Sequence, residues 1–171
     1  MTDLSYSDDE LADILDTVQT IAMPGASASW VRPSHFAMKY LQRKGYRVIP
    51  VNPREAGNTL LGETVYADLA SIPDQFQMVD IFRNSEAAGG ITDEAIAVAK
   101  EKGIKVIWMQ LGVRNDEAAA RAEAAGLKVI MDRCPKIEFG RLYGELSWSG
   151  VNSKIISAKR PRLPRNTKRF G

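Results

Sequence analysis

A run of small residues between a hydrophobic segment and an amphipathic segment has the composition of a phosphate-binding turn. The run is Gly25-Ala26-Ser27-Ala28-Ser29, and it follows hydrophobic residues 20–23. When such a turn joins a parallel strand to a helix, glycine lets the backbone approach a ligand, and the helix N-terminus stabilises an anion. We therefore expect this turn to contact phosphate. The candidate residues in it are Gly25, Ala26, Ser27 and Ser29.

The corner after the second hydrophobic segment, residues 46–51, carries arginine and no acid. Its sequence is Asn52-Pro53-Arg54. A dinucleotide-binding unit carries Asp or Glu about 20 residues beyond its glycines, where the acid accepts hydrogen bonds from ribose hydroxyls. A carboxylate would repel a phosphate on that ribose, whereas Arg54 can pair with it through two charge-assisted hydrogen bonds. The corner therefore favours coenzyme A (CoA) or NADP over NAD.

Two further polar turns follow predicted strands. Arg83-Asn84-Ser85 follows residues 78–82, and Gln110-Leu111-Gly112 overlaps the end of residues 105–110. Right-handed crossovers place the carboxyl ends of parallel strands at one edge of a sheet, where ligands bind. We expect these two turns, the glycine turn and the arginine corner to converge on one cleft.

Residues suited to catalysis are scarce. His35 is the only histidine and Cys134 the only cysteine, which excludes intrachain disulfides and metal sites built from several of either residue. No grouping of His, Cys and carboxylates supplies a positioned acid, base or nucleophile. We therefore expect a non-catalytic binding protein. The alternatives are an NADP-dependent oxidoreductase and a CoA-ligase component that needs a partner chain.

Cys134 raises one hypothesis about a reactive thiol. It follows the last predicted strand, residues 128–131, and lies between Arg133 and Lys136. Neighbouring cations favour the thiolate, which is the form that attacks disulfides. Because CoA ends in a thiol, we consider a mixed disulfide between Cys134 and bound CoA. The alternative is an inert thiol near the edge of the sheet.

Hydrophobic periodicity and turn signals alternate helices with strands, which predicts an α/β, Rossmann-like, doubly wound and mostly parallel sheet with helices on both faces. Ser7 and Glu10 have the spacing of a capping box, and Ser34 is the expected N-cap of the second helix. One turn of helix is expected near residues 67–72. Helices are predicted over residues 7–19, 34–43, 91–102 and 116–125, and strands over 20–23, 46–51, 64–66, 78–82, 105–110 and 128–131.

The 171 residues, 44% of them hydrophobic, are enough for one domain, which we place at residues 1–150. No apolar run approaches membrane-spanning length and the first ten residues are acidic and polar, so we expect a cytoplasmic protein. The rest, 151–171, is a basic tail containing proline, expected to be extended or disordered. We expect this tail to aid solubility or to pack on a neighbouring subunit of a homo-oligomer. Nucleic-acid binding is the less favoured role, because Phe170 is the only aromatic residue of the tail.

Several segments together resemble one known family. They are GAS, RPS, KYL, GYRVIPVNP, DIFR, VIWMQLGV and AGLKVIMDRCPKIE, within about residues 14–142. They resemble the bacterial CoA-binding protein family, whose fold is similar to the N-terminal CoA-binding domain of the succinyl-CoA synthetase alpha subunit. The resemblance implies a Rossmann-like domain that binds CoA or an acyl-CoA at the carboxyl edge of its sheet.

The resemblance also implies where the ligand lies. The turn at Gly25, Ala26 and Ser27 would meet the pyrophosphate, and the corner from Asn52 to Arg54 would lie near the phosphorylated ribose and adenine. The turns from Phe82 to Ser85 and from Gln110 to Gly112 would line the remainder, and Arg32 and Ser34 of the RPS segment complete the candidate set.

Two features depart from that family. Pro24 cannot donate a backbone hydrogen bond, so the turn before Gly25 is expected to sit slightly differently. The second domain of the succinyl-CoA synthetase alpha subunit, which carries a phosphorylated histidine, has no counterpart in these 171 residues. His35 does not replace that histidine, because it lies on the first helical turn after the glycine turn.

Overall fold

The computed structural model describes residues 3–144, and the predicted tail at 151–171 lies outside these residues. Helices and strands alternate over most of the described chain, as hydrophobic periodicity indicated. The elements are α1 (Asp8–Thr17), β1 (Thr20–Pro24), α2 (Pro33–Arg43), β2 (Arg47–Val51), β3 (Thr59–Leu60), β4 (Glu63–Thr64), β5 (Met78–Ile81), α3 (Ser85–Lys102), β6 (Val106–Met109), α4 (Asp116–Ala124), β7 (Lys128–Ile130) and α5 (Pro135–Leu142).

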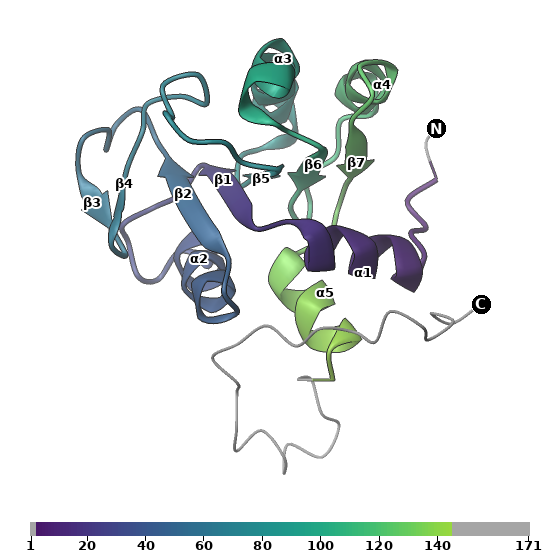
Figure 1. Ribbon diagram of the computed structural model, residues 1–171, viewed down its shortest axis with the longest axis horizontal. Coiled ribbons are helices and arrows are strands. Elements are labelled where there is room, and N and C mark those ends of the chain that lie inside the picture. Colours follow the sequence, from purple (N-terminus) through teal and green to yellow (C-terminus); the bar gives the residue numbers. More distant parts are fainter. Residues whose placement is uncertain (1–2, 145–171) are drawn as a thin grey trace.

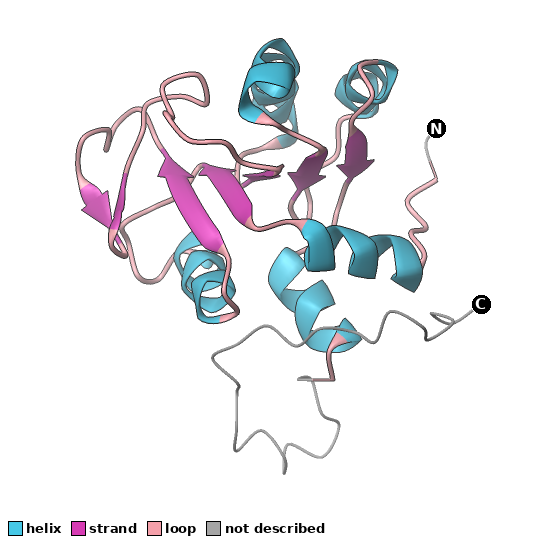
Figure 2. Ribbon diagram, in the orientation of Figure 1, coloured by secondary structure: helices cyan, strands magenta, loops and turns pink. Residues whose placement is uncertain are grey.

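A parallel sheet in the order β2-β1-β5-β6-β7 forms the centre of the fold. The helices cover both faces, with α3 and α4 on one side and α1, α2 and α5 on the other (Figures 1 and 2). The chain leaves β1 for β2 on one side and returns to β5 on the other. Parallel sheets form a ligand-binding crevice at such a reversal of strand order, between β1 and β5.

Alternation along each strand divides the core into two layers. In β5, Met78 packs in the layer with α1, α2 and α5, whereas Val79 and Ile81 pack in the layer of α3 and α4. All four β5 residues are buried, which is the pattern of a central parallel strand covered on both faces. One of them is the charged residue Asp80.

Helix α3 begins six residues earlier than the sequence indicated, at Ser85 and not at residue 91. Asn84 caps it, since its side chain accepts a hydrogen bond from the Ala87 amide at 2.8 Å. Gly89 and Gly90 lie inside the helix. A Cβ on Gly89 would lie 3.0 Å from Asn115 Nδ2, so this glycine permits the close approach of the residue that caps α4.

Two other expectations were wrong. Pro33 is the first residue of α2, so Ser34 lies inside the helix and Arg32 occupies the N-cap without a side-chain hydrogen bond. Residues 67–72 form turns in place of a turn of helix. The short strand expected at 64–66 is present in part, since β4 ends at Thr64 in an antiparallel hairpin with β3 and Tyr66 forms an isolated parallel bridge with Val51. Helix α5 was not predicted.

The segment before α1 is attached to the far end of the sheet. The Met131 amide donates a hydrogen bond to the Tyr6 hydroxyl at 2.9 Å, and the Arg133 guanidinium donates to the Leu4 carbonyl at 2.9 Å. Residues about 125 positions apart in the chain are thereby in contact. Among residues 3–144, no helix is long and apolar enough to cross a membrane.

Candidate functional site

Gly25 makes the turn after β1 at a point where no side chain fits. Its φ is 85°, and a Cβ at this position would lie 2.1 Å from the carbonyl oxygen of Phe82. Its amide donates to the Val51 carbonyl at 3.0 Å. The glycine therefore brings the ends of β2, β1 and β5 together, which opens a cavity above them.

This cavity, which we call the β1-turn cavity, has a volume of about 450 Å³. The N-terminus of α2 lies beside it, with no acidic residue in its first turn. It is lined by Gly25, Ser27, Arg32, Pro33, Ser34, Asn52, Arg54, Glu55 and Phe82. The lining therefore includes the two guanidinium groups of Arg32 and Arg54 and the single carboxylate of Glu55, beside the positive end of a helix dipole. This arrangement favours an anionic ligand.

Hydrogen bonds within the chain hold the walls of the β1-turn cavity in place. The buried Ser34 hydroxyl accepts from the Ser27 amide at 3.2 Å. The Asn52 side chain donates to the Ala26 carbonyl at 2.9 Å and accepts from the Arg54 amide at 3.0 Å. Asn52 thereby ties the arginine corner to the glycine turn, as a preformed site requires.

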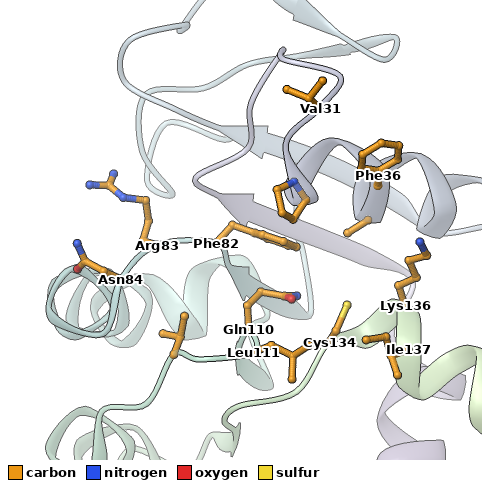
Figure 3. Close-up of a pocket in the computed structure, with 13 residues that line it drawn as sticks. Val31, Phe36, Phe82, Arg83, Asn84, Gln110, Leu111, Cys134, Lys136 and Ile137 are labelled. Atoms are coloured by element: carbon orange, nitrogen blue, oxygen red, sulfur yellow. The ribbon is translucent and has the colours of Figure 1, made fainter.

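A second cavity, the α2–α5 cavity, lies between those two helices at the same edge of the sheet and has a volume of about 730 Å³. It shares Pro33 and Phe82 with the β1-turn cavity. The Phe82 ring and the Cys134 sulfur point into the space between the helices (Figure 3). Most of the remaining wall is apolar, formed by Val31, Phe36, Ala37, Leu111, Val113 and Ile137.

A buried carboxyl lies beneath the α2–α5 cavity. Asp80 is fully buried, and its Oδ1 accepts a hydrogen bond at 2.8 Å from the side-chain amide of Gln110, which lines the cavity. Its Oδ2 has no hydrogen-bond partner among the described residues. Burial raises the pKa of Asp80 to about 7, and the Gln110 hydrogen bond only partly opposes this.

The thiol of Cys134 lines the α2–α5 cavity, so it lies at the carboxyl edge of the sheet, where the sequence predicts the ligand. The expected effect of its neighbours was wrong. Burial raises the pKa of Cys134, and the charge of Asp80 raises it further, while the charge of Lys136 lowers it less than burial raises it. The Arg133 guanidinium is bonded to Leu4 and stacks over the Tyr6 ring, 5.5 Å from its centroid.

The structure brings most of the predicted site residues together. Pro53 lines a small adjoining cavity that also touches Gly25 and Arg83. Those that line the β1-turn cavity are Gly25, Ser27, Arg32, Ser34, Asn52, Arg54 and Phe82, and those that line the α2–α5 cavity are Phe82, Arg83, Asn84 and Gln110.

Four predicted residues line none of these three cavities. Ala26 is buried in the core and Ser29 is exposed, with its amide bonded to the Ser27 hydroxyl. The Ser85 hydroxyl accepts from the Arg114 amide, and the Gly112 amide donates to Asp132. Each of these four has a structural role, and ligand contact by them stays a prediction.

His35 lies half-buried beside a further cavity that includes Trp30 and Tyr40. Its Nδ1 lies 3.4 Å from the Ser27 carbonyl oxygen. His35 thus lies on the first turn of α2, as expected. Within residues 3–144, no group of three or more His, Cys, Asp or Glu side chains is arranged to hold a metal ion.

Sequence reasoning missed Asp80 and the apolar wall of the α2–α5 cavity. A signal for Asp80 exists, because an acid inside the apolar run Met78–Ile81 must be buried. The apolar residues gave no comparable signal, since Phe36 and Ile137 look like ordinary core residues in the sequence. In the structure Phe36 is 50% exposed and Ile137 is 43% exposed, and Leu111, in a turn that was expected to line the cleft, is 56% exposed.

Comparison with known proteins gives consistent matches. Residues 19–140 match the profile of a protein family described as CoA binding domain. The uncharacterized protein YneT of Bacillus subtilis (strain 168) is 35% identical over 128 residues, which is 75% of this chain and 90% of YneT.

Two solved structures are similar over most of the chain. A hypothetical protein from Pyrococcus horikoshii OT3 superposes with a TM-score of 0.74 at 35% identity, covering 84% of this chain and 100% of its own. A Thermus thermophilus protein, cell-free ID.343, has a TM-score of 0.74 at 36% identity, covering 80% of this chain and 99% of its own.

Proposed function

This chain belongs to the CoA binding domain family, and from that premise we propose that it binds coenzyme A without catalysing a reaction on it. The nucleotide occupies the β1-turn cavity at the carboxyl edge of the sheet. The observation that carries this proposal is that Arg32 and Arg54 line one cavity with the N-terminus of α2. Phosphates on the ligand match that combination of charges.

The end of β2 carries no acid, which favours CoA over NAD as the ligand. Asn52, which stands at this corner, uses its side chain to bind the turn backbone. Arg54 is exposed at the rim and is available for a phosphate on the ribose. Glu55 also lines the cavity and would repel a phosphate placed beside it, so the phosphorylated ribose is assigned to the Arg54 side.

The proposed lack of catalysis is supported by the state of the nearest reactive groups. Burial raises the pKa of the Cys134 thiol, which disfavours the nucleophilic thiolate at neutral pH. Asp80 lies beneath the cavity wall and is fully buried. An NADP-dependent oxidoreductase and a CoA-ligase component remain the competing functions, since Arg54 would serve the phosphorylated ribose of NADP equally well.

Thermal unfolding with CoA, acetyl-CoA, NADP, NAD and ATP tests the proposal. CoA should stabilise the protein and NAD should not, because only CoA carries the ribose phosphate. A ligand present at a hundredfold excess over its Kd stabilises the native state by about 2.7 kcal/mol. Stabilisation by NAD without stabilisation by CoA would overturn the proposal, and stabilisation by NADP alone would favour the oxidoreductase.

The variant Arg54→Glu tests which group reads the ribose phosphate. It should weaken CoA binding by about 1.5 to 3 kcal/mol through loss of a charge-assisted pair, with added repulsion from the new carboxylate. Dephospho-CoA should lose much less, because it lacks that phosphate. Arg43→Glu is the control, since it makes the same charge change on the exposed side of α2. Equal losses for both ligands would show that Arg54 does not read the phosphate.

A further inference from the structure

Exposed apolar side chains are concentrated at the α2–α5 cavity. Among residues 3–144, the exposed large hydrophobic residues are Trp30, Val31, Phe36, Leu111 and Ile137. Four of these five line the α2–α5 cavity, and Trp30 lines the adjoining cavity that shares Phe36 and Lys136 with it. Apolar surface gathered in one place on a small protein marks a binding site for an apolar group.

Free CoA does not account for this wall. Its pantetheine arm carries two amides and a hydroxyl and ends in a thiol, so it needs polar partners along most of its length. The α2–α5 cavity offers such partners in Asn84, Gln110 and Lys136. The apolar side chains that line the rest of this cavity match a hydrocarbon chain better than they match the pantetheine arm.

We propose that the α2–α5 cavity holds the pantetheine arm together with an apolar acyl chain, so that the preferred ligand is an acyl-CoA. This inference rests on the proposed function, since the nucleotide must occupy the β1-turn cavity. The two cavities share Pro33 and Phe82, so a ligand anchored by its phosphates in the first continues into the second. The second cavity is also the larger, at about 730 Å³ against about 450 Å³.

Because the α2–α5 cavity is continuous with the β1-turn cavity, its apolar wall suits a small molecule better than a second copy of the chain. The apolar side chains line a hollow between helices α2 and α5, to which α2 contributes Phe36 and α5 contributes Ile137 (Figure 3). A chain that enters from the nucleotide side would be covered on both sides by these residues.

Calorimetric titration with CoA, acetyl-CoA, butyryl-CoA and hexanoyl-CoA tests the proposal on the wild-type protein. Each methylene group transferred into an apolar cavity should lower Kd about fourfold. Hexanoyl-CoA should therefore bind at least about tenfold more tightly than acetyl-CoA, since burial of two methylenes already exceeds that ratio. Succinyl-CoA has the same number of acyl carbons as butyryl-CoA and ends in a carboxylate. It should bind more weakly than butyryl-CoA.

Two variants test the wall itself. Leu111→Asn and Ile137→Asn replace exposed side chains, so the fold should tolerate both. Each should reduce the preference for hexanoyl-CoA over acetyl-CoA, measured as the ratio of the two Kd values within the same variant. Trp30→Asn is the matched control, because Trp30 is the exposed apolar residue outside this cavity. It should leave the preference unchanged.

The possible results distinguish a failure of the proposed CoA-binding function from a failure of the acyl-chain assignment. If neither CoA nor any acyl-CoA binds, the proposed function fails. If CoA and hexanoyl-CoA bind equally, or succinyl-CoA binds more tightly than butyryl-CoA, the function stands and the apolar acyl class is overturned. A preference for hexanoyl-CoA that survives in both wall variants would overturn the placement. Light scattering that shows a dimer dissociated by Leu111→Asn, without chain-length preference, would assign the wall to self-association.

Discussion

Replacing Asp80 by Asn should make the protein more stable at neutral and alkaline pH. Burial raises the pKa of Asp80 from 3.8 to about 7, so the folded state holds a proton that the unfolded chain releases. Below about pH 4 both states are protonated and the carboxyl costs nothing. Between about pH 4 and pH 7 the unfolded state binds fewer protons, and stability falls by about 1.4 kcal/mol per pH unit.

A pKa raised from 3.8 to about 7 corresponds to roughly 4 kcal/mol of lost stability above pH 7. Asn is the same size and neutral, so Asp80→Asn removes this loss. The difference in unfolding free energy between variant and wild type should therefore grow from pH 4 to pH 7 and then remain constant. Urea denaturation at intervals from pH 4 to pH 8.5 measures this difference directly, because contributions from other groups cancel.

Gln110 provides an independent test of how the pKa of Asp80 affects stability. Its amide is the hydrogen-bond donor to Asp80, and this bond lowers the pKa of Asp80. In Gln110→Leu the ionised carboxylate loses that donor, so the loss of stability should continue to a higher pH than in the wild type. Parallel pH profiles for wild type and Asp80→Asn would refute the argument, because they would show that Asp80 titrates alike in the folded and unfolded states.

Three other outcomes follow from the geometry. Gly25→Ala should unfold at a lower temperature than Gly45→Ala: both have positive φ, but a Cβ meets the Phe82 carbonyl only at Gly25. The shared backbone cost is about 1 to 2 kcal/mol, and equal melting temperatures would contradict the predicted clash. Oxidised CoA should form a mixed disulfide with Cys134 slowly at pH 7 and faster at pH 8.5, because burial raises its pKa. Mass spectrometry would detect the adduct, and an adduct that persists in Cys134→Ser would remove the hypothesis. Asn115→Ala should cost about 1 to 2 kcal/mol in urea denaturation through loss of the α4 cap, and an unchanged midpoint would contradict that role.

The sequence predicted most of the fold because its signals are local. Strand residues alternate between the two core layers, and Gly103 ends α3 in the left-handed conformation that a glycine C-cap adopts. Helix α3 shows the limit of such signals. Gly89 and Gly90 look like a break in the helix, yet both lie inside it. Asn115, 26 residues later, approaches Gly89 so closely that a Cβ there would be crowded.

The candidate site was predicted in part for a similar reason. Polar turns after parallel strands are visible in a sequence, so Gly25, Asn52 and Arg54 were found before the structure placed them at one cavity. The apolar wall depends on how α2 and α5 face each other. Neither the packing of α5 nor the exposure of Phe36 and Ile137 can be derived from local pattern, because both follow from tertiary contacts.

The attachment of Leu4 and Tyr6 to Arg133 and Met131 has a consequence for how the chain matures during synthesis. Leu4 and Tyr6 leave the ribosome well before their hydrogen-bond partners, which lie 129 and 125 positions later in the chain. Closing so long a loop is slow and must await the emergence of β7. We expect α1 to gain protection from hydrogen exchange together with β7, after the region around β1, β5 and β6. Protection of α1 in a ribosome-bound chain that lacks residues 128–144 would contradict this order. During translation, the domain would thus expose the apolar face of α1 until β7 is released.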